Sequence, residues 1–275
     1  MATHWHAGRF ALSLHRPLVM GIVNVTPDSF SDGGQHADAV LALRHAQTLL
    51  EEGVDILDIG GESSRPGSAQ LTQAQEWARI APVVQEAVRW NVPVSVDTYQ
   101  PETMRRALEL GVDIINDIHA LQRPGALQIV AASNAGVCLM HMQGDPQTMQ
   151  QAPHYDDVLG EVRQFLLDRA AAAEALGIDR SRIALDPGFG FGKTLQHNLS
   201  LAKHLEALAQ TGYPLLVGVS RKSMIGALTG REVAARLPGS LAAALACVAA
   251  GAQIVRVHDV GPTCDAIKVW NAMRA

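Results

Sequence analysis

The chain has 275 residues, of which 48% are hydrophobic and 18% charged, and its formal net charge is −5. This hydrophobic fraction excludes an intrinsically disordered chain, because such chains cannot bury enough apolar surface to fold. Lys and Arg form no basic stripe, and the longest apolar stretch is about half the ~20 residues of a membrane helix, so we expect neither a nucleic-acid nor a membrane partner.

Short β-branched runs alternate with longer amphipathic stretches along the chain. The runs are mostly apolar without strict alternation, which is typical of parallel strands buried on both faces. The predicted strands are Leu18–Asn24, Val54–Ile59, Val92–Asp97, Asp113–Asn116, Gly136–Met140, Arg182–Asp186, Leu215–Ser220 and Gln253–Val257. The predicted helices include Ala37–Glu52, Pro101–Leu110, Tyr155–Leu176, Leu195–Ala209, Leu241–Ala250 and Cys264–Met273.

Repeated strand–helix units with no linker between them predict an α/β protein with a single (β/α)8 TIM barrel over residues 18–275. Residues 1–17 are expected to form a short N-terminal extension, a hairpin or plug across the bottom of the barrel. No secretory signal pattern is visible there. The three cysteines, Cys138, Cys247 and Cys264, are too few and too widely spaced for a disulfide framework. We therefore expect a cytoplasmic protein.

Polar side chains gather where the predicted strands end. In a (β/α)8 barrel these carboxyl ends meet at one face, where active sites lie. A buried charge costs several kcal/mol unless it is paired, so this concentration predicts a functional site. The acceptors Asp97, Asn116 and Asp186 suit a flat heterocycle with several N–H donors. The cationic groups, which suit phosphate or carboxylate, are Arg65, Lys222, Arg256 and His258.

Two sequence features do not support the functions that they first suggest, a phosphate-binding loop and a metal site. The Gly192-Lys193-Thr194 string resembles the end of a phosphate-binding P-loop, but Pro187 stands where that motif needs glycine. The 11 histidines form no HExxH pattern, so we do not expect a metal site built by protein ligands alone.

Structural roles compete with the functional ones. Asp97 and Asp186 could cap the segments that follow them, and Asn116 could be a core amide bonded to a neighbouring strand. The residues for which we favour a structural role are Asp117, His141 and Arg221, the last of which we expect to pair with another loop.

Eight strings along the chain resemble the dihydropteroate synthase family. They are NVTPDSFSDGG (24–34), IGGESSRPGS (59–68), VDT (96–98), IINDI (114–118), LMHMQG (139–144), LDPGFGFGK (185–193), SRKS (220–223) and VRVHDV (255–260). The resemblance implies a transferase that joins 6-hydroxymethyl-7,8-dihydropterin diphosphate to 4-aminobenzoate and releases diphosphate and 7,8-dihydropteroate. It also implies a homodimer and a Mg²⁺ ion, held mainly by phosphate oxygens and water, with Asn24 as its protein ligand.

The resemblance further implies a role for each matching residue. Expected in catalysis are Asp32, Lys222, Arg256 and His258. Expected to bind the pterin are Asp97, Asn116, Met140, Asp186, Lys222 and Arg256. Expected at the diphosphate are Asn24, Ser64, Arg65, Arg256 and His258. Expected at 4-aminobenzoate are Thr26, Pro27, Phe30, Ser64, Arg65, Pro66, Phe191, Lys222 and Ser223.

One position departs from the family pattern, and two other functions compete with it. Ser64 stands where threonine is expected, so the hydroxyl is kept but the methyl that restricts χ1 is lost. The resemblance assigns this side chain to contact with 4-aminobenzoate or its sulfonamide mimics, so the lost methyl lies at that contact. A methyltetrahydrofolate–corrinoid methyltransferase would share the pterin acceptors, but it has no diphosphate to hold, and the SRKS and RVH strings argue against it. A catalytically inactive pterin-binding scaffold is the second alternative.

Overall fold

The computed structural model describes residues 2–25, 34–62 and 70–274. Its main sheet has eight parallel strands in the order β8-β7-β6-β5-β4-β3-β10-β9. A parallel bridge between Leu185 and Leu215 joins the two outer strands, so the sheet closes into the predicted (β/α)8 barrel. The strands are β3 (Leu18–Asn24), β4 (Ile56–Gly60), β5 (Val94–Asp97), β6 (Ile114–Asp117), β7 (Gly136–Met140), β8 (Ile183–Asp186), β9 (Leu216–Val217) and β10 (Ile254–Val257).

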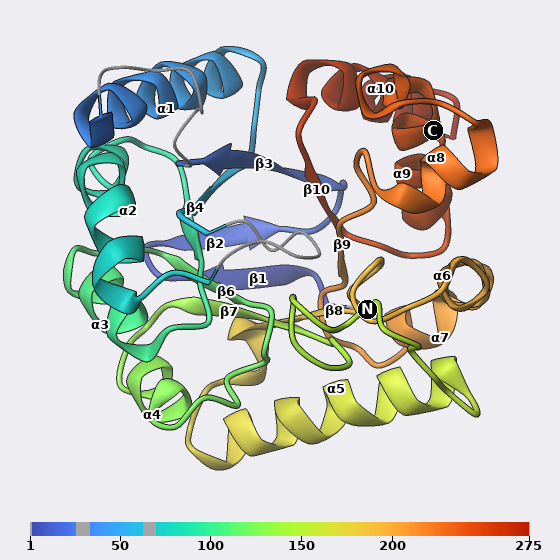
Figure 1. Cartoon of the computed structure of the whole chain (residues 1–275), viewed down its shortest axis with the longest axis horizontal. Coiled ribbons are helices and arrows are strands. Elements are labelled where there is room, and N and C mark those ends of the chain that lie inside the picture. Colours follow the sequence, from blue (N-terminus) through green and yellow to red (C-terminus); the bar gives the residue numbers. More distant parts are fainter. Residues whose placement is uncertain (1, 26–33, 63–69, 275) are drawn as a thin grey trace.

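Helices form a ring around these strands (Figure 1). They are α1 (Gly34–Glu51), α2 (Gln73–Ala87), α3 (Pro101–Glu109), α4 (Ala126–Ala131), α5 (Val158–Ala175), α6 (Leu195–Lys203), α7 (Glu206–Ala209), α8 (Ser223–Thr229), α9 (Leu237–Ala249) and α10 (Val260–Ala272). Among the described residues, no helix is both long and apolar enough to cross a membrane.

The ends of most predicted elements differ from the structure by one to four residues. For example, α9 and α10 begin at Leu237 and Val260, four residues before the predicted starts. Two further differences follow from local contacts. The predicted helix Leu195–Ala209 is divided between α6 and α7, because the chain leaves the helical conformation at His204, which has φ −116°. The backbone N–H of His204 donates to Ser200 O at 3.2 Å, and its ring Nδ1 lies 2.9 Å from the same oxygen. The predicted strand Leu215–Ser220 is shorter, because its ladder with β10 ends at Val217.

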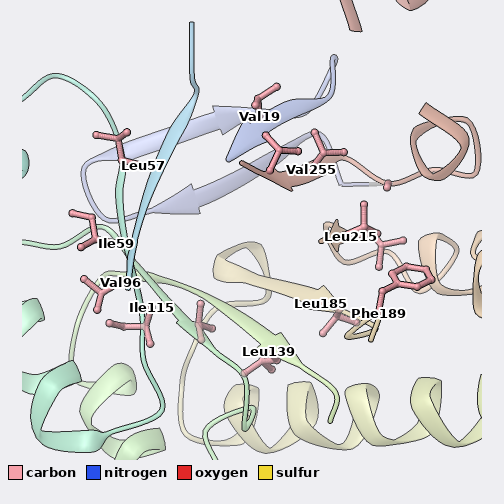
Figure 2. Close-up of a cluster of buried hydrophobic side chains, with 14 of the residues drawn as sticks. Val19, Leu57, Ile59, Val96, Ile115, Leu139, Leu185, Phe189, Leu215 and Val255 are labelled. Carbon is pink, nitrogen blue, oxygen red and sulfur yellow. The ribbon is translucent and has the colours of Figure 1, made fainter. Parts of the chain in front are cut away.

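Alternate residues of each strand face opposite sides of the barrel wall. Leu57 and Ile59 of β4 point outwards into the main core cluster, together with apolar residues of the helices. Figure 2 shows this outward layer on successive strands, for example at Val19, Val96 and Val255. The alternate residues of each strand face the barrel interior, where their polar side chains can contact a ligand.

At the amino-terminal ends of the strands, apolar side chains and the N-terminal hairpin fill the barrel interior. β1 (His4–Ala7) and β2 (Phe10–Ser13) pair antiparallel and lie across the middle of the ring of helices (Figure 1). Trp5 is fully buried against the first residues of the barrel strands, and its indole N–H donates to Arg182 O at 2.9 Å. The expected hairpin is therefore present, and it closes the amino-terminal end of the barrel.

Candidate functional site

The inward-facing side chains change from apolar to polar near the carboxyl ends of the strands. The strand register places Asp97 beside Asn116, and Met140 beside Asp186. On β4 the inward position two residues after Ile56 is Asp58, and on β10 the position two residues after Ile254 is Arg256. The alternation of the strands thus carries these groups to one level inside the barrel, above the hairpin.

Arg256 lies at the centre of this polar layer. Its Nε donates to Asp58 Oδ2 at 2.6 Å, and its Nη2 donates to Asp97 Oδ2 at 2.6 Å. Asn116 Nδ2 donates to the same Asp58 oxygen at 3.2 Å. The planar guanidinium therefore links carboxylates from two different strands, a geometry that a lysine ammonium cannot reproduce.

Asp58 is a site residue that the sequence analysis did not predict. It is fully buried, and its Oδ1 has no hydrogen-bond partner among the described residues. An unpaired buried carboxylate oxygen is costly, so Oδ1 is suited to a donor supplied from the barrel mouth. The available signal was a single charged residue inside the apolar string of β4, at an inward-facing position.

Burial also raises the pKa of the two predicted carboxylates, Asp97 and Asp186. It raises the pKa of Asp97, against the opposing positive charge of Arg256. It raises the pKa of Asp186 as well, and Lys222 and the Gly188 N–H oppose it. That N–H donates to Asp186 Oδ1 at 2.7 Å, so Asp186 does cap the following segment, as the structural interpretation expected.

Lys222 lies over the same end of the barrel. Its Nζ donates to Phe189 O and lies 4.5 Å from the centre of the Phe191 ring. A Cβ placed on Gly218 would lie 3.8 Å from Arg256 Cβ and 3.9 Å from Lys222 Nζ, so the missing side chain keeps the space beside both cations open. Burial lowers the pKa of Lys222 to about 8, although the charge of Asp186 opposes this shift.

An apolar group adjoins these charges. Met140 clusters with Tyr99 and Ile118, and Phe191 packs against the same cluster. The mouth of the barrel thus combines hydrogen-bond acceptors, cations and an apolar wall, which together suit a planar heterocycle that carries an anion.

His258 is oriented by a serine. Ser220 Oγ lies 3.1 Å from His258 Nδ1 and accepts the His258 backbone N–H at 3.2 Å. The neighbouring Arg221 donates from Nε to Asp259 Oδ2 at 2.9 Å, so the loops after β9 and β10 are tied together. This confirms the prediction that Arg221 pairs with another loop.

The remaining predicted residues fall into three groups. Asn24, at the end of β3, and Ser223, at the start of α8, are exposed at the carboxyl-terminal side. Asp117 is structural, as predicted, because its carboxylate accepts the backbone N–H groups of His119 and Leu121, each at 2.7 Å. The predicted residues that lie outside the described part of the chain are Thr26, Pro27, Phe30, Asp32, Ser64, Arg65 and Pro66.

Comparisons with known proteins show the family to which the chain belongs. The family model described as pterin binding enzyme matches residues 20–258. Dihydropteroate synthase of Neisseria meningitidis serogroup C is 58% identical, with 99% of both chains covered. The structure of Xanthomonas albilineans dihydropteroate synthase with 4-aminobenzoic acid superposes with a TM-score of 0.93 at 49% identity, covering 100% of this chain and 99% of that one. The Burkholderia cenocepacia enzyme complexed with 7,8-dihydropteroate gives 0.90 at 48% identity, with 99% and 96% covered. The chain therefore belongs to the pterin-binding enzymes and, within them, to the dihydropteroate synthases, which are transferases.

Proposed function

We propose that the polar layer around Arg256 binds the pterin of the dihydropteroate synthase reaction. In that reaction the chain condenses 6-hydroxymethyl-7,8-dihydropterin diphosphate with 4-aminobenzoate and forms 7,8-dihydropteroate and diphosphate. The observation that carries the proposal is the link from Arg256 to Asp58 and Asp97, with Asn116 on the same Asp58 oxygen.

The pterin edge presents an amino group and a ring N–H, both of which are donors. Asp97 and Asp186 supply acceptors for them. Asn116 directs its Nδ2 to Asp58, which leaves its amide oxygen to accept from the ligand. Arg256 has five N–H donors, of which two contact the carboxylates, so its plane can lie against the ring while other donors reach phosphate. Met140 contributes an apolar surface beside the ring.

The diphosphate leaves a carbon attached to an electron-rich ring, so the C–O bond can break early and give a stabilised cation. Arg256 and His258 face the departing anion in this proposal, and Asn24 lies at the rim. The arylamine nitrogen then donates its lone pair to the carbon, a C–N bond forms, and one N–H proton is lost. Ser64 and Arg65 at the diphosphate and Asp32 at the cation remain proposals on residues outside the described ranges.

A Mg²⁺ ion fits this arrangement through one protein ligand. Across residues 2–25, 34–62 and 70–274, no three or more His, Cys, Asp or Glu side chains are grouped so that they could hold a metal. The exposed amide of Asn24 offers an oxygen, which suits an ion that keeps most of its ligands from phosphate and water. When bound, Mg²⁺ would neutralise charge on the leaving diphosphate.

4-Aminobenzoate is placed beside the Lys222 ammonium. Phe191 supplies an aromatic wall under that ammonium, and the exposed Ser223 supplies a hydroxyl for the carboxylate. The same proposal includes Thr26, Pro27, Phe30, Ser64, Arg65 and Pro66.

We further infer a cytoplasmic homodimer. The three cysteines are unpaired, which suits a reducing compartment. Val269 and Met273, on and just after α10, are exposed apolar side chains that a second copy could cover. Sedimentation equilibrium measures the mass, and a monomer at micromolar concentration would contradict the dimer.

An assay of diphosphate release tests the activity. The purified chain is given the pterin diphosphate and Mg²⁺, with and without 4-aminobenzoate. Release that depends on the amine, with 7,8-dihydropteroate formed, is expected. Folded protein that binds pterin without releasing diphosphate would instead support the scaffold, and methyl transfer from methyltetrahydrofolate to a corrinoid would support the methyltransferase.

Asp186→Asn is expected to weaken binding of the pterin diphosphate at least tenfold, about 1.4 kcal/mol. The amide would present a donor where the ligand also has donors. Titration calorimetry measures the change, and Asp156→Asn, at a highly exposed side chain, is the matched control. Wild-type affinity in Asp186→Asn would remove Asp186 from the pterin site.

A further inference from the structure

Lys193 ends the glycine loop 188–192 and is buried, with 3% of its surface exposed. Its Nζ lies 3.0 Å from His141 Nδ1, 3.0 Å from both Gly188 O and Phe191 O, and 3.3 Å from His141 O. The Lys193 ammonium is therefore surrounded by backbone carbonyls and an imidazole, and it donates to no carboxylate among the described residues. The reaction proposed above gives this side chain no role.

His141 is suited to accept from this ammonium. Burial and the charge of Lys193 lower the pKa of His141 to about 3, so its ring is neutral at physiological pH. Lysine has three donors and no acceptor when charged, so Nδ1 is the accepting nitrogen of His141. Burial also lowers the pKa of Lys193 to about 7, and Asp186 opposes this shift.

The loop that Lys193 contacts is packed closely on the segment after β7. A Cβ on Gly188 would lie 2.0 Å from His141 O, and a Cβ on Gly192 would lie 2.4 Å from Gln143 O. Both glycines have positive φ, at 66° and 59°. No side chain can be inserted here, so the two backbone segments meet directly and the Lys193 ammonium joins them.

The same loop carries groups of the proposed site. Phe189 is buried in the core (Figure 2), and its carbonyl accepts from Lys222. The Phe191 ring lies under the same ammonium at 4.5 Å. The carbonyls of Gly188 and Phe191, on either side of Phe189, both accept from Lys193. Core packing thus fixes the middle of the loop, and Lys193 fixes the backbone of Phe191.

We infer that Lys193 and His141 form a positioning pair, which acts through the glycine loop to place Phe191 and Lys222 for 4-aminobenzoate. This inference rests on the proposed function and adds the residues that hold its second-substrate side. It differs from a P-loop lysine, because the Lys193 ammonium is enclosed by protein acceptors, four of which lie within 3.3 Å of Nζ. It also differs from a role in folding alone, because it predicts a change in substrate affinity.

Lys193→Met keeps the length of the side chain and removes its donors. The KM for 4-aminobenzoate is expected to rise at least tenfold. The KM for the pterin diphosphate should rise less, because only Asp186 and Lys222 of the proposed pterin contacts touch the loop. Asp97, Asn116 and Arg256 lie on other strands of the barrel. A residue needed for folding alone would lower the melting temperature but leave the KM of the folded enzyme unchanged. The exposed Lys203→Met is the control.

A second pair of variants tests the inference if Lys193→Met does not fold. His141→Asn retains an oxygen acceptor close to the position of Nδ1, whereas His141→Leu has none. We expect a wild-type KM for 4-aminobenzoate, within threefold, in His141→Asn and a rise of at least tenfold in His141→Leu. Equal values in the two variants, or a wild-type KM in folded Lys193→Met, would overturn the inference. An inactive wild-type enzyme would instead overturn the proposed function.

Discussion

Arg256→Lys is expected to lower kcat/KM at least a hundredfold, about 2.7 kcal/mol of lost transition-state stabilisation. An ammonium is a point charge and cannot hold Asp58 and Asp97 in the fixed geometry of the guanidinium fork. One carboxylate inside the barrel would lose its partner, and breaking a buried ion pair in this way costs about 3–5 kcal/mol. The variant should therefore also melt at a lower temperature.

The two effects are separated by measuring kinetics well below the melting transition of the variant. Arg89→Lys is the matched control, because Arg89 has an exposed side chain paired with Glu86 on the surface. A folded Arg256→Lys enzyme with the kcat/KM of the wild type would show that the bridge between the two carboxylates is dispensable for the reaction.

Much of this site follows from the period of two along each strand. That period places Asp97, Asn116 and Arg256 on the inward face once the strands are assigned, and the barrel topology brings their ends together. Asp58 has the same parity but was not predicted, and its contact with Arg256, 198 residues away in the chain, forms only in the closed sheet. The alternation along a strand predicts which side of the sheet a side chain faces. Its hydrogen-bond partner on another strand is determined only when the sheet closes into a barrel.

The loops show a similar division. The prediction that Arg221 pairs with another loop was correct, but its left-handed conformation at φ 57° could not be predicted from its neighbours.

α2 was not predicted, although Thr72 and Gln75 form a capping box at its start, a signal that the sequence contains. The role inferred for Lys193 depends on its contact with His141, which requires the loops after β7 and β8 to be packed together.

Lys222→Ala is expected to lower kcat at least tenfold, about 1.4 kcal/mol, because the proposed site loses the cation beside both substrates. Because burial lowers the pKa of Lys222 to about 8, the ammonium form predominates below that pH and is lost above it. The wild-type kcat/KM should therefore fall along an alkaline limb near pH 8. The Lys222→Ala variant should lack the part of the limb centred near pH 8. The buried ammonium of Lys193 remains in the variant, but its pKa is lowered to about 7, so it is lost at lower pH.

The matched control for this variant is Lys203→Ala, which removes an exposed lysine from the last turn of α6. A pH profile is more informative than a single rate, because a loss of packing would lower activity at every pH without removing the limb. Unchanged steady-state kinetics in Lys222→Ala would contradict its role in the reaction. A lower rate with the limb preserved would show that Lys222 contributes contacts and that another group carries the titration.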